Sequence, residues 1–411
     1  MFKNGTRTIY PIDTQRHSRR KVQRYLCQQC GQSFTLRRQK HKRYTRQFAV
    51  EVTRRHVEER VSYRVLAKRY RETLGVRVSA TSLQRMVDEI GRACKTPAEM
   101  SRELGLTDWR GYLVADDKHI SIDGKNVVWY LGVDTTGDVI HADTLKERTV
   151  TEMIGSFFGV IRDELSYPMK GLTSDQEVLF ALAFGKVFPG KPHQICITHA
   201  LDSLDKHLGY VRQKGRIEKR KREVRAMLRS LPDRGTDQSA RRLWEEIKRG
   251  YQEIRTLSES LQPVDQLRRA IRRVLCARTY VSATARWASF HRHRLRHHPA
   301  YRKIVDFVSR RWKSLTVHYH FRGMPSTNNI AENTMRQLER RLKTIEGFGS
   351  RRSARGYMNL LIAYLRTKPY TDCRRYRKYR NGLCRLELAG AILPTKDWLK
   401  LCLKPPSRTN R

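Results

Sequence analysis

Three acidic residues of this chain occupy positions from which their carboxylates could hold divalent metal ions. Asp116 directly follows an apolar run, Asp175 follows the short segment LTS, and Glu332 lies near the start of a helical pattern. Carboxylate oxygens are preferred ligands of Mg²⁺ and Mn²⁺, and a pair of such ions catalyses phosphoryl transfer. We therefore expect a two-metal site, provided that the fold brings these three segments together.

The residues around the two aspartates predict a sheet. Residues 112–122, 127–134 and 139–145 have strand patterns separated by short Gly or Asp turns, which predicts an antiparallel meander. A helix from Thr149, which has capping-box spacing to Glu152, is expected next. A strand at 171–175, a helix at 178–184, a strand at 193–199 and a helix from about residue 200 complete the pattern. This order predicts a ribonuclease H-like α/β core, a mixed sheet with flanking helices.

The third acid lies on a separate helix that begins near residue 326. Met335, Leu338, Leu342 and Ile345 share one face of this helix, and Gly347 ends it. Two structural alternatives remain open at this point. A glutamate in a first helical turn is favoured by the helix dipole without any chemistry, and Asp117 could be the ligand in place of Asp116.

The rest of the chain predicts regions that would position DNA. Helical patterns at 46–95 include an N-cap at Ser62, a turn at Gly75 and capping-box spacing between Thr81 and Gln84. Together they favour a helix-turn-helix DNA-binding region over an ordinary helical hairpin. The DNA-contacting candidates are Arg77, Gln84 and Arg85 in this region and Arg336, Arg340, Arg341 and Lys343 after Glu332.

The chain start resembles half of a zinc site. Cys27 and Cys30 lie two residues apart with Gly31 behind them, but a structural Zn²⁺ takes four ligands. His17 and His41 are the histidines nearest to the pair, and neither has a partner at ligand spacing. We expect either a bound zinc ion or a degenerate knuckle held by packing.

The regions of the chain differ in their balance of basic and acidic residues. The chain carries 85 Lys and Arg against 40 Asp and Glu, which indicates a nucleic-acid partner. Residues 112–200 reverse the balance, with 8 basic and 12 acidic side chains, which is consistent with a metal-binding use. The expected divisions are a basic arm at 1–45, the helix-turn-helix region at 46–95, a linker at 96–111, core parts at 108–201 and 321–367, a helical insertion at 202–320 and a basic tail at 368–411.

The acidic array resembles that of the DDE transposases, in particular the Mutator-like branch of bacterial insertion-sequence enzymes. The segment LVADDKHISI is similar to the first-aspartate strand of that branch, and TSDQ to its second. Cys196 and His199 match its Cys-x-x-His signature, and Asn329 precedes the glutamate by three residues as in that branch. The sequence departs from the branch at Asp117, where Gly or Glu is more common, and in the missing first cysteine pair of the zinc ribbon.

The resemblance implies a transposase that binds the terminal inverted repeats of an insertion sequence, cleaves DNA with two Mg²⁺ or Mn²⁺ ions and transfers the strand to target DNA. Asp116, Asp175 and Glu332 would be its catalytic metal ligands. The partners implied are double-stranded DNA and further copies of the chain. A polar, basic start and the lack of a long apolar run predict a cytoplasmic, nucleoid-associated protein without a membrane segment. The alternative is a catalytically inactive or domesticated DNA-binding regulator.

Overall fold

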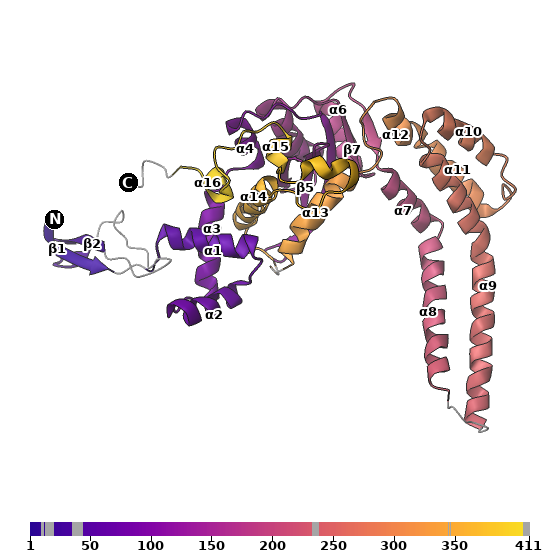
Figure 1. Cartoon of the computed structure of the whole chain (residues 1–411), viewed down its shortest axis with the longest axis horizontal. Coiled ribbons are helices and arrows are strands. Elements are labelled where there is room, and N and C mark those ends of the chain that lie inside the picture. The colour runs from indigo at the N-terminus through magenta and orange to yellow at the C-terminus, as the bar shows by residue number, and fades with distance from the viewer. Residues whose placement is uncertain are drawn as a thin grey trace. The chain divides into compact units, whose positions relative to one another are not determined.

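The computed structural model divides the chain into two compact units (Figure 1). The first unit contains residues 1–169, 182–189 and 329–411, and the second contains residues 170–181 and 190–328. The structure describes residues 1–9, 12, 20–34, 44–231, 238–343, 345 and 347–405.

A five-stranded mixed sheet has the strand order β6-β5-β4-β7-β8. β4 (Tyr112–Ile122), β5 (Lys125–Asp134) and β6 (Val139–Thr144) form the expected antiparallel meander, with Asp116 paired to Leu131. β7 (Gly171–Ser174) and β8 (His193–Ile195) pair in parallel. The five strands that the sequence patterns predict are therefore present, but the last is shorter than expected: it ends at Ile195 and a helix begins at Ile197, where the pattern predicted a strand to residue 199. The fold is a mixed α/β structure.

Helices of the first unit come from both ends of the chain. They are α1 (Arg46–Glu58), α2 (Tyr63–Leu74), α3 (Ala80–Arg92), α4 (Pro97–Glu103), α5 (Val150–Met153), α13 (Asn329–Leu342), α14 (Arg351–Thr367), α15 (Arg385–Leu388) and α16 (Trp398–Cys402). α5 continues as two π-helical segments, Ile154–Phe158 and Val160–Glu164, which bury Phe157, Phe158 and Ile161. A small antiparallel sheet of β1 (Phe2–Ile9), β2 (Arg20–Leu26) and β3 (Ser33–Phe34) precedes them.

Several local expectations are corrected by the cap geometry. Ser62 caps α2 as expected, but α3 is capped by Ser79, whose hydroxyl accepts a hydrogen bond from the Ser82 amide, and the capping box from Thr81 is wrong. The expected linker contains α4, which begins with a reciprocal capping box between Thr96 and Glu99. That Thr-Pro-x-Glu pattern is readable in the sequence and was overlooked.

The C-terminal tail is folded against the first unit where it was expected to be a basic extension. The Lys95 amide donates to the Cys402 carbonyl at 2.8 Å, and the Lys404 amide donates to the Ala93 carbonyl at 2.9 Å. Trp398 is buried and packs edge-on against Tyr364. Apolar residues spaced among the basic ones therefore dock this segment, whereas the short 3-10 segment Arg375–Arg380 keeps the basic, largely exposed character of the prediction.

α3 and α14 cross at two glycines. A Cβ atom on Gly356 would lie 2.9 Å from the Gly91 carbonyl carbon, and a Cβ on Gly91 would meet Gly356 at the same distance. Only glycine allows such a close backbone approach. The crossing therefore joins the N-terminal helices to the helix that follows α13, within one unit.

We expect Gly356→Ala to destabilise the protein by about 1–3 kcal/mol, because the added methyl group must push apart two packed backbones. The measurement is the midpoint of urea unfolding. Gly215→Ala in α8 is the matched control, since a Cβ atom there meets nothing within 4 Å. It should leave stability unchanged or raise it by up to about 1 kcal/mol. Equal stability of the two variants would contradict the tight crossing.

The second unit is mainly helical, as expected for the insertion. Its helices are α7 (Ile197–His207), α8 (Tyr210–Arg229), α9 (Gln238–Leu275), α10 (Tyr280–Phe290), α11 (Pro299–Ser309) and α12 (Trp312–Thr316), followed by a 3-10 turn at Val317–Tyr319. α8 and α9 run side by side as a long hairpin (Figure 1). Leu267, Ile271, Ile304 and Val308 are among the side chains of its core. Throughout the described part of the chain, every helix is too short or too polar to cross a lipid bilayer.

Candidate active site

α13 positions Glu332 alongside the strand that carries Asp116. α13 packs against β4 and β5, and Lys118 of β4 forms an ion pair with Glu339 of α13 at 3.2 Å. After α13, the Phe348 amide donates to the Ser121 carbonyl at 3.0 Å, and the Asp123 amide donates to the Phe348 carbonyl at 2.7 Å. Later residues of the α13 segment thus contact later residues of β4, so helix and strand run in the same direction.

From this direction we expect Glu332 to lie near the level of Asp116. Glu332 precedes Glu339 by two helical turns, a rise of about 10 Å. Along a strand, the same distance corresponds to about three residues. Three residues before Lys118, which pairs with Glu339, the strand reaches Ala115, the neighbour of Asp116. Glu332 is half-buried in the first turn of α13.

The pleat of β4 distinguishes Asp116 from Asp117. Side chains alternate between the two faces of a strand. Asp116 therefore points to the same face as Lys118, whose partner Glu339 lies on α13, whereas Asp117 points to the opposite face. On that opposite face Tyr130, the strand partner of Asp117, packs against Phe157 with the two rings tilted by 58°. The strand register therefore favours Asp116 as the residue that faces the glutamate helix.

In the second unit, Asp175 lies immediately beyond the carboxyl end of β7. Its carboxylate accepts a hydrogen bond from the Glu177 amide at 3.1 Å, which shapes the turn into α6 (Val178–Val187). Carboxylate oxygens of Asp175 and Glu177 lie within 4.8 Å of each other. Glu177 is thus a second acid at this turn that the sequence reasoning missed; its two-residue spacing from Asp175 is a signal that could have identified it.

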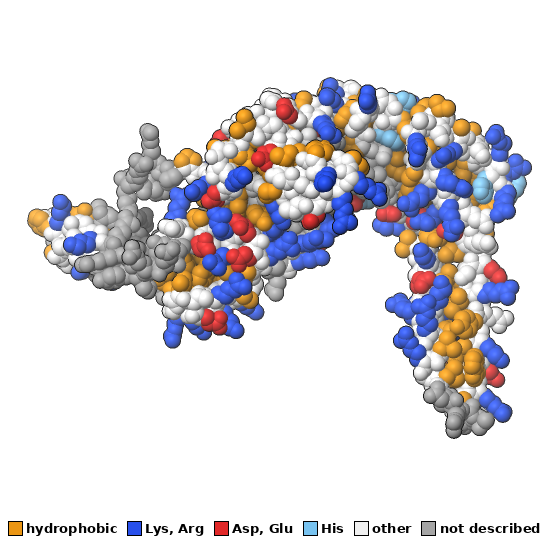
Figure 2. Space-filling view, in the orientation of Figure 1, with side chains coloured by type: hydrophobic (Ala, Val, Ile, Leu, Met, Phe, Trp, Pro, Cys, Tyr) orange, Lys and Arg blue, Asp and Glu red, His pale blue; other side chains and the backbone are white. Residues whose placement is uncertain are grey.

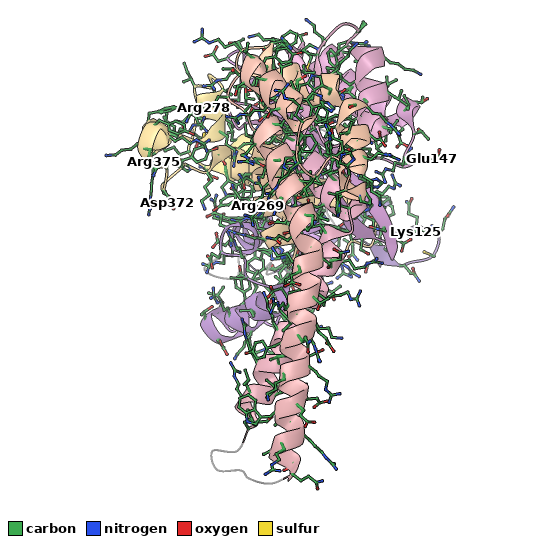
Figure 3. The ribbon with its side chains drawn as sticks, turned by 90° about the vertical axis from the view of Figure 1, so that its right-hand side faces the viewer. Lys125, Glu147, Arg269, Arg278, Asp372 and Arg375 are labelled. Atoms are coloured by element: carbon green, nitrogen blue, oxygen red, sulfur yellow. The ribbon has the colours of Figure 1, made fainter. Side chains whose placement is uncertain are left out.

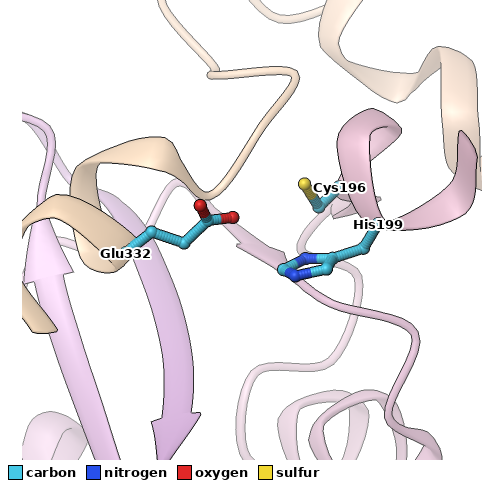
Figure 4. A group of neighbouring side chains, drawn as sticks. All are labelled: Cys196, His199 and Glu332. Atoms are coloured by element: carbon cyan, nitrogen blue, oxygen red, sulfur yellow. The ribbon is translucent and has the colours of Figure 1, made fainter. Parts of the chain in front are cut away.

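Cys196 and His199 lie where β8 meets α7 (Figure 4). The Cys196 sulfur and a ring nitrogen of His199 are within 4.8 Å of each other. Cys196 is fully buried; its amide donates to the Ser174 carbonyl at 2.7 Å, and its sulfur accepts from the Asn328 amide at 3.4 Å. Cys196 therefore joins the end of β7 to the segment that leads into α13.

Buried polar residues brace the β8 strand. The Gln194 side chain donates to the Leu315 carbonyl at 3.1 Å and accepts from the His318 amide at 2.9 Å. Burial lowers the pKa of His193 to about 4, so its imidazole is neutral near pH 7. The His193 ring nitrogen lies 2.9 Å from the Ser174 hydroxyl, one residue before Asp175. Because the ring is neutral, this histidine carries no positive charge that would compete with a metal ion for the Asp175 carboxylate.

The DNA-contacting candidates differ in exposure. Arg77, Gln84, Arg85, Arg336, Arg340 and Lys343 are exposed. Arg341 is buried, with its guanidinium stacked 4.5 Å from the centre of the Tyr364 ring, and burial lowers its pKa. Arg341 is therefore a packing residue between α13 and α14 in this structure. Asn329 is exposed as the first residue of α13, whereas its neighbour Asn328 is fully buried.

Cys27 and Cys30 flank a tight turn after β2. The Gly31 amide donates to the Cys27 carbonyl at 3.0 Å, and hydrogen bonding from the Cys30 backbone lowers the pKa of the Cys27 thiol. No third His, Cys or carboxylate joins them among the residues that the structure describes, and His17 and His41 lie outside those residues. The pair supplies two of the four ligands that Zn²⁺ requires, so zinc remains an expectation.

Residues 220–356 match the model of the IS66 transposase family. The match covers about a third of the chain, from α8 to the start of α14, and includes Glu332 but neither aspartate. It supports a transposase of the DDE type. The Mutator-like assignment is not supported, because IS66 is a different family. A comparison with curated proteins found no match.

Proposed function

We propose that this protein is a DDE-type transposase that binds the terminal inverted repeats of a mobile element and catalyses metal-dependent DNA strand cleavage and strand transfer. The observation that carries the proposal is that Glu332 lies inside the IS66 match and on α13, the helix that packs against the strand of Asp116. The proposal is independent of which insertion-sequence branch the chain belongs to.

The third ligand of the proposed site is Asp175. The continuity of the chain supports its joining the other two acids. Asn328 contacts Cys196 beside the end of β7, and Glu332 follows only four residues later. Four residues span at most about 14 Å even when fully extended. A ribonuclease H-like core, in which three such acids converge, is part of this proposal.

Three carboxylates form an all-oxygen donor set, which suits Mg²⁺ or Mn²⁺. When bound, two such ions would lower the pKa of an attacking water and stabilise the leaving oxygen of the phosphodiester. Asp116, Asp175 and Glu332 would hold them. Arg336 and Arg340, which are exposed on α13, would hold phosphates of the substrate.

DNA recognition is assigned to α2 and α3. α3 presents Gln84 and Arg85 to solvent, while Leu83, Met86 and Val87 of the same helix are buried. Amide and guanidinium groups at exposed positions of a second helix are suited to reading base edges in a major groove. Because two element ends must be joined in one event, we propose that the protein acts as a homo-oligomer, in the cytoplasm and on the nucleoid.

The test is strand cleavage of a duplex that carries an element end. We expect cleavage by the wild-type protein in Mg²⁺ or Mn²⁺, none in EDTA, and loss of cleavage in Glu332→Gln, because an amide is a far weaker ligand than a carboxylate. DNA binding in EDTA should persist in both proteins. Gln337→Glu, an exposed change on the same helix, is the control and should cleave normally. Wild-type binding without any cleavage would instead identify an inactive DNA-binding regulator.

A further inference from the structure

The end of α9 and the turns that follow it form a basic hollow in the second unit. The hollow has a volume of about 750 Å³ and is lined by Gln266, Arg269, Arg272, Arg273, Cys276, Arg286, His293 and Arg294. A second hollow of about 470 Å³ adjoins it and shares Arg273, Arg286 and His293. Figure 3 looks onto this side of the molecule and labels Arg269 and Arg278.

The surrounding segment has no acidic residue to neutralise these arginines. Residues 266–305 contain eleven Lys or Arg, four His and no Asp or Glu. Asp265, one residue before the segment, pairs with Arg269 at 2.5 Å and also contacts Arg268. Guanidinium groups stay charged at every physiological pH, so the hollow carries a permanent excess of positive charge that a polyanion would offset.

Hydrogen bonds to neutral groups hold the arginines in place. Arg286 donates to the Arg273 carbonyl at 2.7 Å, and Arg294 donates to the Gln266 side chain at 2.7 Å. Each of these guanidinium groups has further N–H groups and its full charge still available. Burial, and after it the positively charged neighbours Arg294 and Arg273, lower the pKa of His293. These hydrogen bonds thus hold the arginine side chains in place, but they do not neutralise the positive charge of the guanidinium groups.

The size of the hollow indicates an extended polyanion. Arg269, Arg272 and Arg273 share one face of α9, and Cys276 directly follows its last residue, so that the four extend over about two turns, about 10 Å. That length corresponds to about three successive phosphates of one DNA strand, whose axial spacing is about 3.4 Å. The opposite face of this part of α9, with Leu267, Ile271 and Val274, is buried in the helical core.

We propose that this hollow is a sequence-independent binding site for the DNA phosphate backbone, separate from the acidic residues. The assignment rests on the proposed function, because it names DNA as the polyanion. It gives the helical insertion a role of its own: the insertion would bind the duplex that flanks the cleaved phosphodiester.

The experiment measures binding of a fluorescent 30-base-pair duplex of arbitrary sequence by the full chain in EDTA, from 50 to 200 mM KCl. The triple variant Arg272→Ala, Arg273→Ala, Arg294→Ala should bind at least tenfold more weakly at 100 mM salt. Its slope of log affinity against log salt should fall by about 2.7, or 0.9 per lost contact. The control triple removes the same charge from the far part of α9 (Arg241→Ala, Arg242→Ala, Arg255→Ala) and should change affinity less than twofold.

Equal effects of the two triples, or wild-type binding by the first, would overturn the proposal. A selective loss of duplex RNA binding would also overturn it, since the partner would then be RNA. The triple Arg→Lys variant at the same three positions keeps the charge and should keep the salt slope; a collapsed slope would show that charge is not the cause. Because EDTA prevents cleavage, the result stands or falls separately from the catalytic proposal.

Discussion

Asp116→Asn is expected to lower the rate of metal-dependent DNA cleavage by about three orders of magnitude or more, roughly 4 kcal/mol in activation free energy. The change removes one negative charge and one metal-binding oxygen while keeping the size of the side chain. Asp116 faces the side of β4 that α13 covers, and α13 is the helix that carries Glu332. DNA binding in EDTA should be unchanged.

Asp117→Asn is the paired comparison, because Asp117 neighbours Asp116 but points to the other face of β4, and its carboxylate is itself a candidate metal ligand. If Asp116 is the ligand, the cleavage rate of Asp117→Asn stays within about tenfold of the wild type. The two variants are compared in a single-turnover assay on a pre-cut and an intact element end, so that cleavage and joining are measured separately. A dead Asp117→Asn variant and an active Asp116→Asn variant would assign the ligand to Asp117 and refute the argument from the strand pleat.

The second large effect is expected on stability. Arg366 and Asp138 form a fully buried ion pair, with Nε to Oδ1 and Nη2 to Oδ2 distances of 2.8 Å. Arg366 also donates to the Pro97 carbonyl and the Ser101 hydroxyl, and Asp138 accepts from the Trp109 indole. Arg366→Met leaves the buried carboxylate without its cation and should destabilise the protein by about 3–5 kcal/mol.

Urea unfolding measures this effect, and Arg54→Met is the control. Arg54 pairs with Asp397 at 2.7 Å, but about 30% of its side chain is exposed, so solvent screens the pair. Loss of this ion pair should lower the free energy of unfolding by no more than about 1 kcal/mol. The double variant Arg366→Met, Asp138→Leu should recover part of the loss, because it removes both charges together. Equal stability of Arg366→Met and Arg54→Met would show that the buried pair contributes little.

The strands could be predicted from sequence because alternation and Gly turns are local signals. The same holds for the helix of Glu332, whose apolar positions repeat at helical spacing. The burial of Arg341 and the docking of the tail by Trp398 could not be predicted in this way. Both depend on contacts between segments far apart in the chain, as in the stacking of Arg341 on Tyr364.

The acidic island shows a second limit of sequence reasoning. Its excess of carboxylates pointed to metal binding, yet several of them are structural. Asp134 is fully buried and accepts hydrogen bonds from the Tyr167 hydroxyl and the Gly111 amide. Asp138 pairs with Arg366, and Asp143 pairs with Arg355. Net charge cannot separate an acid that is satisfied by its own fold from one that is available to a ligand.

The glycine crossing of α3 and α14 has a consequence for the length of DNA that the protein can accept. Under the proposed function, the helix that reads an element end and the helix that carries Glu332 belong to one compact unit, in which α3 and α14 meet at Gly91 and Gly356. The distance between the recognised sequence and the bond that is cut would then be fixed by the protein. An element end with a few base pairs inserted between the recognised sequence and the scissile bond would be bound normally, yet present the wrong phosphodiester for cutting.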